Sequence, residues 1–334
     1  MHKIPTVTTE KGDSVKLAVI INSFNRLQLL EKSLESIAHA VQDLSLDTAI
    51  IVFDAGSTDG SIQYVEEIAK LSITNTICLI TPNSRDESSF SHGCNSAIAF
   101  AIERFTRLEY FLFFETDNFI KHSSSLLKAI QLLASLEVLA AVGFTVERFD
   151  GKKAGFGASF PSPLSFILGQ QISRKLGLNT FKKYLWNDFE GNRWLACETV
   201  FTSPLLVKRS AWIDIGPMDA ERFPFSDCDT DWCWRAEHNG WSIAVLDVPG
   251  VIHDNQQQQS SWSLNRVLNF HQSRLRLLLK HKGEWIKHLR VLLLLRHCIE
   301  LSILVFKSLS SEKAQKSLVC RVNLIKVVFN NYEY

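Results

Sequence analysis

Motifs that would define several common protein classes are missing from this sequence of 334 residues. Its seven cysteines are odd in number and include no C-x-x-C pair, which argues against a disulfide framework and a zinc site. Residues 1–14 contain no apolar segment of the kind found in export signals. We therefore expect a flexible N-terminus over residues 1–15 and a protein of the reducing cytoplasm.

Glycine-rich nucleotide-binding loops are also absent. The turn after the first apolar run reads NSFNRLQ, whereas a nicotinamide dehydrogenase carries G-x-G-x-x-G there. The sequence contains no G-x-x-x-x-G-K-[ST], which excludes a P-loop enzyme. It also lacks the glycine-rich basic loop with which sugar nucleotidylyltransferases open.

An excess of one charge is missing as well. The formal net charge is only +1, so a nucleic-acid partner is not expected. This total hides an asymmetry, because residues 262–334 hold 13 Lys and Arg against 4 Asp and Glu, a net of +9. Residues 1–261 therefore carry a net of −8, and the protein is an acidic body with a basic extension.

The basic extension has no apolar run of the ~20 residues that a membrane span needs. Arg296, His297 and Glu300 interrupt its leucine-rich stretches. Such a segment fits a helix that lies on an anionic membrane surface through residues 264–308. It fits equally a helical cap packed on the rest of the chain, and the sequence leaves both interpretations open.

Buried strands and amphipathic helices alternate through the first 120 residues. Apolar runs without polar alternation occupy residues 16–22, 49–53, 76–80 and 110–114, and helical periodicity fills the intervals between them. This pattern predicts an α/β fold with a mostly parallel central sheet, Rossmann-like and flanked by helices. Residues 150–194 show no clear periodicity and are expected to form loops and short elements over the sheet.

Acids and turn residues follow the predicted strands at the edge where ligands bind in such sheets. The clearest example is FFETDN, where Glu115 and Asp117 share a face and could both reach one divalent cation. A solvated strand end is the alternative. Likewise, Asp54 in VFDAGSTDG could accept hydrogen bonds from a nucleobase or ribose, or the segment could be a turn with Asp59 as a helix N-cap.

A third acidic group precedes an aromatic helix. Asp227, Asp229 and Asp231 alternate in SDCDTDWCWR, and one of them could be a general base. They could instead cap the helix N-terminus and favour its dipole. The neighbouring thiols of Cys228 and Cys233 are interpreted as packed side chains, because two further metal ligands are lacking.

A lone histidine, His253, follows a short apolar run in VIHD. It could complete a metal shell or contact a diphosphate, although a single histidine is more often structural.

The order of these motifs resembles the inverting family 2 glycosyltransferases with the GT-A fold, most of all the bacterial rhamnosyltransferase-like members that build surface polysaccharides and lipopolysaccharide. The resemblance rests on SFNR, DAGSTDG, ETDN, IGPMD, CDTDWCWR and VIHD, and covers about residues 16–260. It implies that Asp54 binds the nucleobase and that Glu115 and Asp117 hold Mg²⁺ or Mn²⁺. It also implies His253 near the diphosphate and Asp229 as the base.

Two positions depart from the family pattern. Glu115 stands where the family has Asp, and Cys228 stands where it usually has Glu, so Asp227 remains a rival for the base.

From the resemblance we expect a GT-A catalytic domain over residues 16–261, with a nucleotide half (16–121) and an acceptor half (122–261), followed by a helical extension (262–334). We expect the nucleotide at Ser23, Asn25, Arg26, Asp54, Gly56, Ser57, Asn95 and Thr116. The metal is expected at Glu115, Asp117 and His253. Candidates for contact with the acceptor or the donor sugar are Trp194, Glu198, Asp231 and Arg235.

The implied partners are a nucleotide-sugar donor and a saccharide or lipid-linked acceptor. The best estimate of the donor is dTDP-rhamnose, and UDP-sugars come next. A non-catalytic scaffold with the same fold is the alternative from a different class. The implied location is the cytoplasm, with the inner face of the cytoplasmic membrane as a second site.

Overall fold

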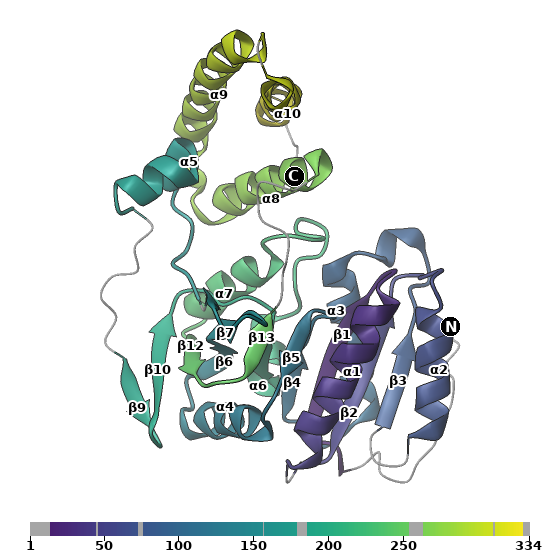
Figure 1. The fold of residues 1–334 in the computed structure, drawn as a ribbon. Coiled ribbons are helices and arrows are strands. Elements are labelled where there is room, and N and C mark those ends of the chain that lie inside the picture. Colours follow the sequence, from purple (N-terminus) through teal and green to yellow (C-terminus); the bar gives the residue numbers. More distant parts are fainter. Residues whose placement is uncertain are drawn as a thin grey trace. The chain divides into compact units, whose positions relative to one another are not determined.

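The computed structural model describes residues 14–44, 46–72, 76–155, 157–178, 186–253, 263–309 and 311–329. The chain divides into two compact units, which Figure 1 draws with their labelled elements. Unit 1 comprises Met1–Ala158 and Lys183–Gln256, and unit 2 comprises Ser159–Lys182 and Gln257–Tyr334. Each unit is described separately below.

Unit 1 is built on a nine-stranded sheet in the order β3-β2-β1-β4-β11-β6-β12-β10-β9. The strands are β3 (Thr76–Ile80), β2 (Thr48–Asp54), β1 (Leu17–Ser23), β4 (Tyr110–Phe113), β11 (Leu205–Lys208), β6 (Leu139–Phe144), β12 (Ser242–Asp247), β10 (Asn192–Cys197) and β9 (Asn187–Phe189). The first four run parallel. Beyond them the sheet is mixed, because β11 is antiparallel to β4 and β6, and β10 is antiparallel to β12 and β9.

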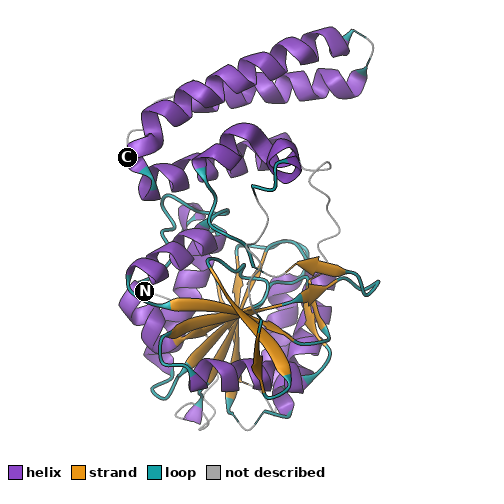
Figure 2. Cartoon of the chain, turned by 90° about the vertical axis from the view of Figure 1, so that its left-hand side faces the viewer, coloured by secondary structure: helices purple, strands orange, loops and turns teal. Residues whose placement is uncertain are grey.

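Helices cover both faces of this sheet, which Figure 2 shows as a fan of strands enclosed by helices. They are α1 (Leu27–Gln42), α2 (Ser61–Leu71), α3 (Phe90–Arg104), α4 (Ser123–Ser135), α6 (Arg209–Ile215) and α7 (Cys228–His238), with a short 3₁₀ turn at Arg85–Glu87. The periodic apolar residues of α1, among them Leu30, Leu34 and Ile37, are buried in the main core. On the opposite face, a Cβ at Gly93 of α3 would lie 2.5 Å from Phe53 Cδ1, so only glycine permits that approach.

A smaller sheet brings distant parts of unit 1 together. Its order is β5 (Asn118–Ile120), β13 (Val251–His253), β7 (Val146–Glu147) and β8 (Lys153–Gly155). The β5 and β13 strands are antiparallel, and their register sets His253 opposite Asn118. A histidine from the end of the unit therefore lies beside the acids that follow β4.

Unit 2 is helical (Figures 1 and 2). It contains α5 (Pro163–Lys175), α8 (Leu264–His281), a 3₁₀ turn at Gly283–Trp285, α9 (Ile286–Ser308) and α10 (Glu312–Phe329). A small core joins them, with Leu275 and Leu278 of α8, Leu289 and Leu293 of α9, and Val328 of α10. No helix in the described ranges has the length and apolar character to cross a bilayer.

One sequence-based expectation fails here. Residues 150–194 were expected to be loops and short elements laid over the sheet, yet the 13-residue α5 lies within them and belongs to unit 2. The helix escapes periodicity analysis because it is broken at Gly169, which has a φ of 76°.

Candidate functional site

Three side chains of metal-ligating type lie together just beyond the end of β4. One ligand atom from each of Glu115, Asp117 and His253 lies within 4.8 Å of the other two. The His253 Nε2 atom is 3.5 Å from Asp117 Oδ1. Two carboxylates and an imidazole suit a divalent cation such as Mn²⁺ or Mg²⁺. The structure thus brings together the three residues that the sequence assigned to a metal.

The donor atoms of this cluster fit a cation. Asp117 Oδ1 is buried and has no hydrogen-bond partner among the described residues. A buried acceptor without a donor is costly, and a bound cation would remove that cost. Arg26 lies beside the cluster, with one guanidinium nitrogen 3.7 Å from Asp117 Oδ2 and 3.4 Å from Thr116 Oγ1.

Two hydroxyls that the sequence did not single out orient Glu115. Thr202 Oγ1 donates to Glu115 Oε1 at 3.1 Å, and Ser203 Oγ donates to the same oxygen. Both residues precede β11, whose first residue, Leu205, is paired with Phe113 of β4. Two hydroxyl residues before a proline are not a recognisable motif in a sequence. Their position beside Glu115 becomes evident only in the structure, where β11 is inserted antiparallel to β4.

The loops after β1 and β2 hold each other in place. Asn25 has a left-handed φ of 50°, which asparagine tolerates better than most residues. Its backbone N–H donates to Ser57 Oγ at 2.8 Å, and its Oδ1 accepts from the backbone N–H of Thr58 at 2.8 Å. Asn25, Arg26 and Ser57 therefore occupy one edge of the sheet, as predicted for a nucleotide site. Ser23, at the end of β1, is buried, and its hydroxyl has no partner among the described residues.

The side chain of Asp54 forms hydrogen bonds within the turn that follows β2. Its side chain is fully buried, and Oδ1 accepts from the backbone N–H groups of Gly56 at 3.0 Å and Ser57 at 2.6 Å. Oδ2 accepts from Ser57 Oγ at 2.8 Å. This carboxylate therefore supports the turn from beneath, and its contact with a nucleobase stays a prediction. Gly56 has a φ of 95°, which suits glycine.

Asp59 ties two helices to this turn. Its Oδ1 accepts from the backbone N–H and the hydroxyl of Ser61, the first residue of α2, and its Oδ2 accepts from the backbone N–H of Leu27, the first residue of α1. These hydrogen bonds, above all that from the Ser61 hydroxyl, lower the pKa of Asp59. The alternative of Asp59 as the N-cap is wrong, because Gly60 is the N-cap residue of α2, although Asp59 accepts from the first N–H of that helix.

Asn95 is engaged with the backbone. Its Nδ2 donates to the carbonyl of Met218 at 2.8 Å, and its Oδ1 accepts from the N–H of Met218 at 3.0 Å. Both ends of the amide are therefore used to fasten the Ile215–Asp219 segment to α3. Binding of the nucleotide by Asn95 stays a prediction.

The two candidate bases lie at the start of α7. Asp227 has a left-handed φ of 61° and occupies the N-cap position. Asp229 is partly buried and accepts a 2.7 Å hydrogen bond from the backbone N–H of Thr230. Burial, followed by the negative charges of Asp227 and Glu115, raises the pKa of Asp229 to about 6. A carboxylate with that pKa is a competent proton acceptor near neutral pH.

The same loop reaches both the acids and the base. The backbone N–H of Thr202 bonds to Asp229, while its hydroxyl bonds to Glu115. The metal-ligand cluster and the candidate base are thus parts of one site.

Asp231 and Arg235, predicted to contact a sugar, are committed to the protein instead. Asp231 is fully buried and pairs with Arg235 Nε at 3.0 Å. The other guanidinium nitrogens of Arg235 donate to the carbonyls of Ile215 and Pro217, each at 2.7 Å. This ion pair fixes the loop before α7, and contact of either residue with a sugar stays a prediction.

The other two sugar candidates are also displaced from the acids. Trp194 packs against the main core and is paired with Leu246. Glu198 follows Cys197, which is paired with Ile243 near the amino end of β12, at the edge opposite to the carboxyl ends of β1 and β4. Spacing alone could not show which face or end of β10 these residues occupy.

All seven cysteines are free thiols, and burial raises the pKa of Cys233 to about 12. Cys228 is buried at the start of α7 beside Asp229.

Comparison with known proteins identifies the class. Residues 18–198 match the model of the family described as Glycosyl transferase family 2, and because this is more than half of the chain, the protein belongs to that family of glycosyltransferases. Among proteins of curated function, none matches the chain in sequence.

Solved structures agree on the fold. The mannosyltransferase PcManGT from Pyrobaculum calidifontis, in complex with GDP-Man and Mn²⁺, is similar with a TM-score of 0.52 at 15% identity, over 95% of this chain and 86% of that one. S. aureus TarS 1-349 in complex with UDP-GlcNAc gives 0.51 at 16% identity, over 94% and 82%. The predicted GT-A fold and family are confirmed.

The raised pKa of Asp229 predicts a pH-dependent gain of stability in the Asp229→Asn variant. The neutral acid is favoured in the folded state, so its contribution is complete below about pH 4 and is lost as the pH rises through about 6. At pH 8, without divalent cations, Asp229→Asn should raise the free energy of unfolding by about 1–3 kcal/mol. Urea unfolding in EDTA at pH 4 and pH 8 measures it. The exposed-carboxylate control Asp86→Asn should show no such pH-dependent difference, and an equal gain for Asp229→Asn at both pH values would contradict the assignment.

The hydroxyl support of Glu115 predicts a loss of cation affinity when it is removed. Changing Thr202→Val together with Ser203→Ala removes both donors while leaving the backbone bond to Asp229, and Mn²⁺ affinity should fall by about 10-fold or more. Calorimetric titration with Mn²⁺ is the measurement. Ser135→Ala, which removes a hydroxyl bonded within α4, is the matched control. Unchanged affinity in the double variant would show that the two hydroxyls do not support a metal ligand.

Proposed function

We propose that this glycosyltransferase moves a sugar from a nucleotide-diphosphate donor to an acceptor hydroxyl with inversion, and that it requires a divalent metal. The observation that carries the proposal is the shared site of Glu115, Asp117, His253 and Asp229, linked through Thr202. The nucleotide sugars in the two similar structures support a donor of the same kind, and the Mn²⁺ in the PcManGT complex supports a divalent cofactor.

Asp229 acts as the base in this proposal. Its carboxylate accepts the proton of the acceptor hydroxyl as the hydroxyl oxygen forms a bond to the anomeric carbon. The bond between that carbon and the diphosphate oxygen breaks in the same displacement, so no covalent sugar–enzyme intermediate is needed.

The diphosphate is received at the cluster beyond β4. Glu115, Asp117 and His253 would hold Mg²⁺ or Mn²⁺, which stabilises the charge of the leaving diphosphate when bound. Arg26, half-exposed beside Asp117, supplies a fixed positive charge to the same phosphates. The hydrogen bond from the Asn25 backbone N–H to Ser57 Oγ holds together the loops after β1 and β2 on the nucleotide side of the site.

For the donor we propose dTDP-rhamnose, with UDP-sugars as the alternative, and for the acceptor a saccharide or lipid-linked saccharide of a bacterial surface polysaccharide. The order of motifs along the sequence supports this choice. The cytoplasm, or the inner face of the cytoplasmic membrane, is the location where such donors and lipid-linked acceptors meet.

The choice of base is tested by two asparagine variants. Asp229→Asn keeps the hydrogen bond from Thr230 but cannot take a proton, so turnover should fall by about 10²-fold or more. Asp227→Asn is the matched comparison, because asparagine tolerates the left-handed backbone of that position. Both should retain nucleotide affinity, measured by calorimetry. If Asp229→Asn keeps its turnover and Asp227→Asn loses it, the base is Asp227.

The donor is tested by a panel of nucleotide sugars with Mn²⁺. Release of nucleoside diphosphate is measured for dTDP-rhamnose, UDP-sugars and GDP-mannose, with Asp117→Asn as the control lacking a metal ligand. We expect the highest rate with dTDP-rhamnose and loss of the rate in EDTA. A higher rate with a UDP-sugar would replace the donor, and absence of metal-dependent binding to every donor would favour a scaffold.

A further inference from the structure

Helix α9 in unit 2 exposes its apolar side. From Val291 to Phe306, its exposed positions carry no charged side chain and are apolar except for Cys298 and Ser302. The large members of this apolar face of α9, each 43–76% exposed, are Val291, Leu292, Leu295, Ile299, Ile303, Val305 and Phe306. They recur at helical spacing, so they form one stripe along the helix.

Three polar residues in the middle of α9, Arg296, His297 and Glu300, are turned toward the rest of unit 2, whereas His288 and Lys307 near its ends are exposed. Arg296 donates to the carbonyl of Phe166 at 2.9 Å and pairs with Glu300 at 3.1 Å. Glu300 also pairs with Arg321 of α10 at 2.6 Å. His297 is fully buried, and its Nδ1 accepts from Arg321 at 2.7 Å. Between Val291 and Phe306, α9 therefore directs its charged side chains toward unit 2 and exposes leucine and isoleucine. A surface helix that faces water has the opposite arrangement.

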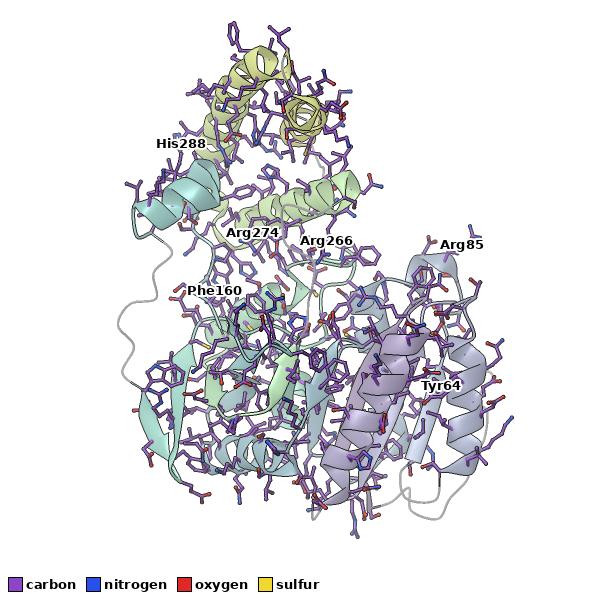
Figure 3. The ribbon with its side chains drawn as sticks, viewed as in Figure 1. Tyr64, Arg85, Phe160, Arg266, Arg274 and His288 are labelled. Atoms are coloured by element: carbon purple, nitrogen blue, oxygen red, sulfur yellow. The ribbon has the colours of Figure 1, made fainter. Side chains whose placement is uncertain are left out.

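The unit that carries this face is strongly basic. Residues 159–182 and 257–334 together contain 16 Lys and Arg and only 4 Asp and Glu. Figure 3 labels two of these cations, Arg266 and Arg274, on α8. Trp285, which is 51% exposed, lies at the start of α9, and tryptophan favours the interface between water and lipid.

We propose that unit 2 binds the surface of an anionic membrane, with the apolar face of α9 inserted among the lipid headgroups and the helix lying in the plane of the membrane. An amphipathic surface helix combines an apolar face with basic residues in this way.

The charge of the unit favours a lipid occupant over a second copy of the chain. Pairing two α9 faces would bring two units of net charge +12 together, and like charges oppose such pairing. Anionic lipid offers the opposite charge and an apolar layer at once. We do not propose that α9 crosses the membrane, because it contains Arg296 and Glu300 and no described helix is long and apolar enough to span a bilayer.

This places the contact on α9 and not along the whole of residues 264–308, the range expected from the sequence. The leucines of α8, among them Leu275, Leu278 and Leu279, are buried in the core of unit 2.

The experiment is vesicle flotation of the full chain without any substrate, so that its result is independent of which sugar is transferred. Vesicles contain phosphatidylcholine with or without 30% phosphatidylglycerol. The test variant carries Leu295→Gln, Ile299→Gln and Phe306→Gln. The matched control carries Leu71→Gln, Val138→Gln and Ile213→Gln, which change exposed apolar residues of unit 1. Circular dichroism verifies that both variants remain folded.

We expect the wild type and the control to float with anionic vesicles, less so at high salt, and the test variant to bind about 10-fold more weakly or worse. Equal binding by the test variant and the wild type would overturn the role of α9. So would a wild type that does not bind vesicles. Sedimentation without lipid adds a second check, since a wild-type dimer that the α9 substitutions convert to monomers would assign the face to a second copy.

Discussion

The crowding of carboxylates at one edge of the sheet is the constraint on which the rest of unit 1 depends. Glu115 and Asp227 both raise the pKa of Asp229 through their charges, and Asp117 lies within ligand distance of Glu115. Like charges in a partly buried site repel one another. The fold offsets part of this repulsion with hydroxyl and amide donors, and the cation that we propose for this site would offset the remainder.

Other acids and amides near this edge have a different task. Asp54 and Asp59 brace the turn after β2, Asn95 fastens the Ile215–Asp219 segment, and the Asp231–Arg235 pair holds the loop before α7. Without these braces the loops that carry Asn25, Thr202 and Asp229 would have no fixed positions. The short polar motifs of this chain therefore contain two kinds of residue. Some face the site, and others hold the loops that carry them.

The fold followed from patterns that are local in sequence. β1 and β2 are continuous apolar runs because both faces of the sheet are covered, and α1 shows its buried stripe in its spacing. The metal-ligand cluster was also predictable, because acids at the ends of parallel strands meet at one edge. Thr202 and Ser203 were not, since the antiparallel insertion of β11 brings them to Glu115. The contacts of Asn95 and Arg235 with the backbone were missed, because the sequence alone does not distinguish a side chain that hydrogen-bonds a backbone carbonyl from one that hydrogen-bonds a sugar.

The pairing of β5 with β13 also concerns the making of the protein. A chain leaving the ribosome exposes Glu115 and Asp117 early, whereas His253 joins them only when β13 has been synthesised and has zipped against β5. The nine-stranded sheet is also completed late in synthesis, because its strand β12 is separated from β13 by only a short turn. The three candidate metal ligands therefore come together only in a chain whose unit 1 is essentially complete, and chains that end before β13 lack His253 at this cluster.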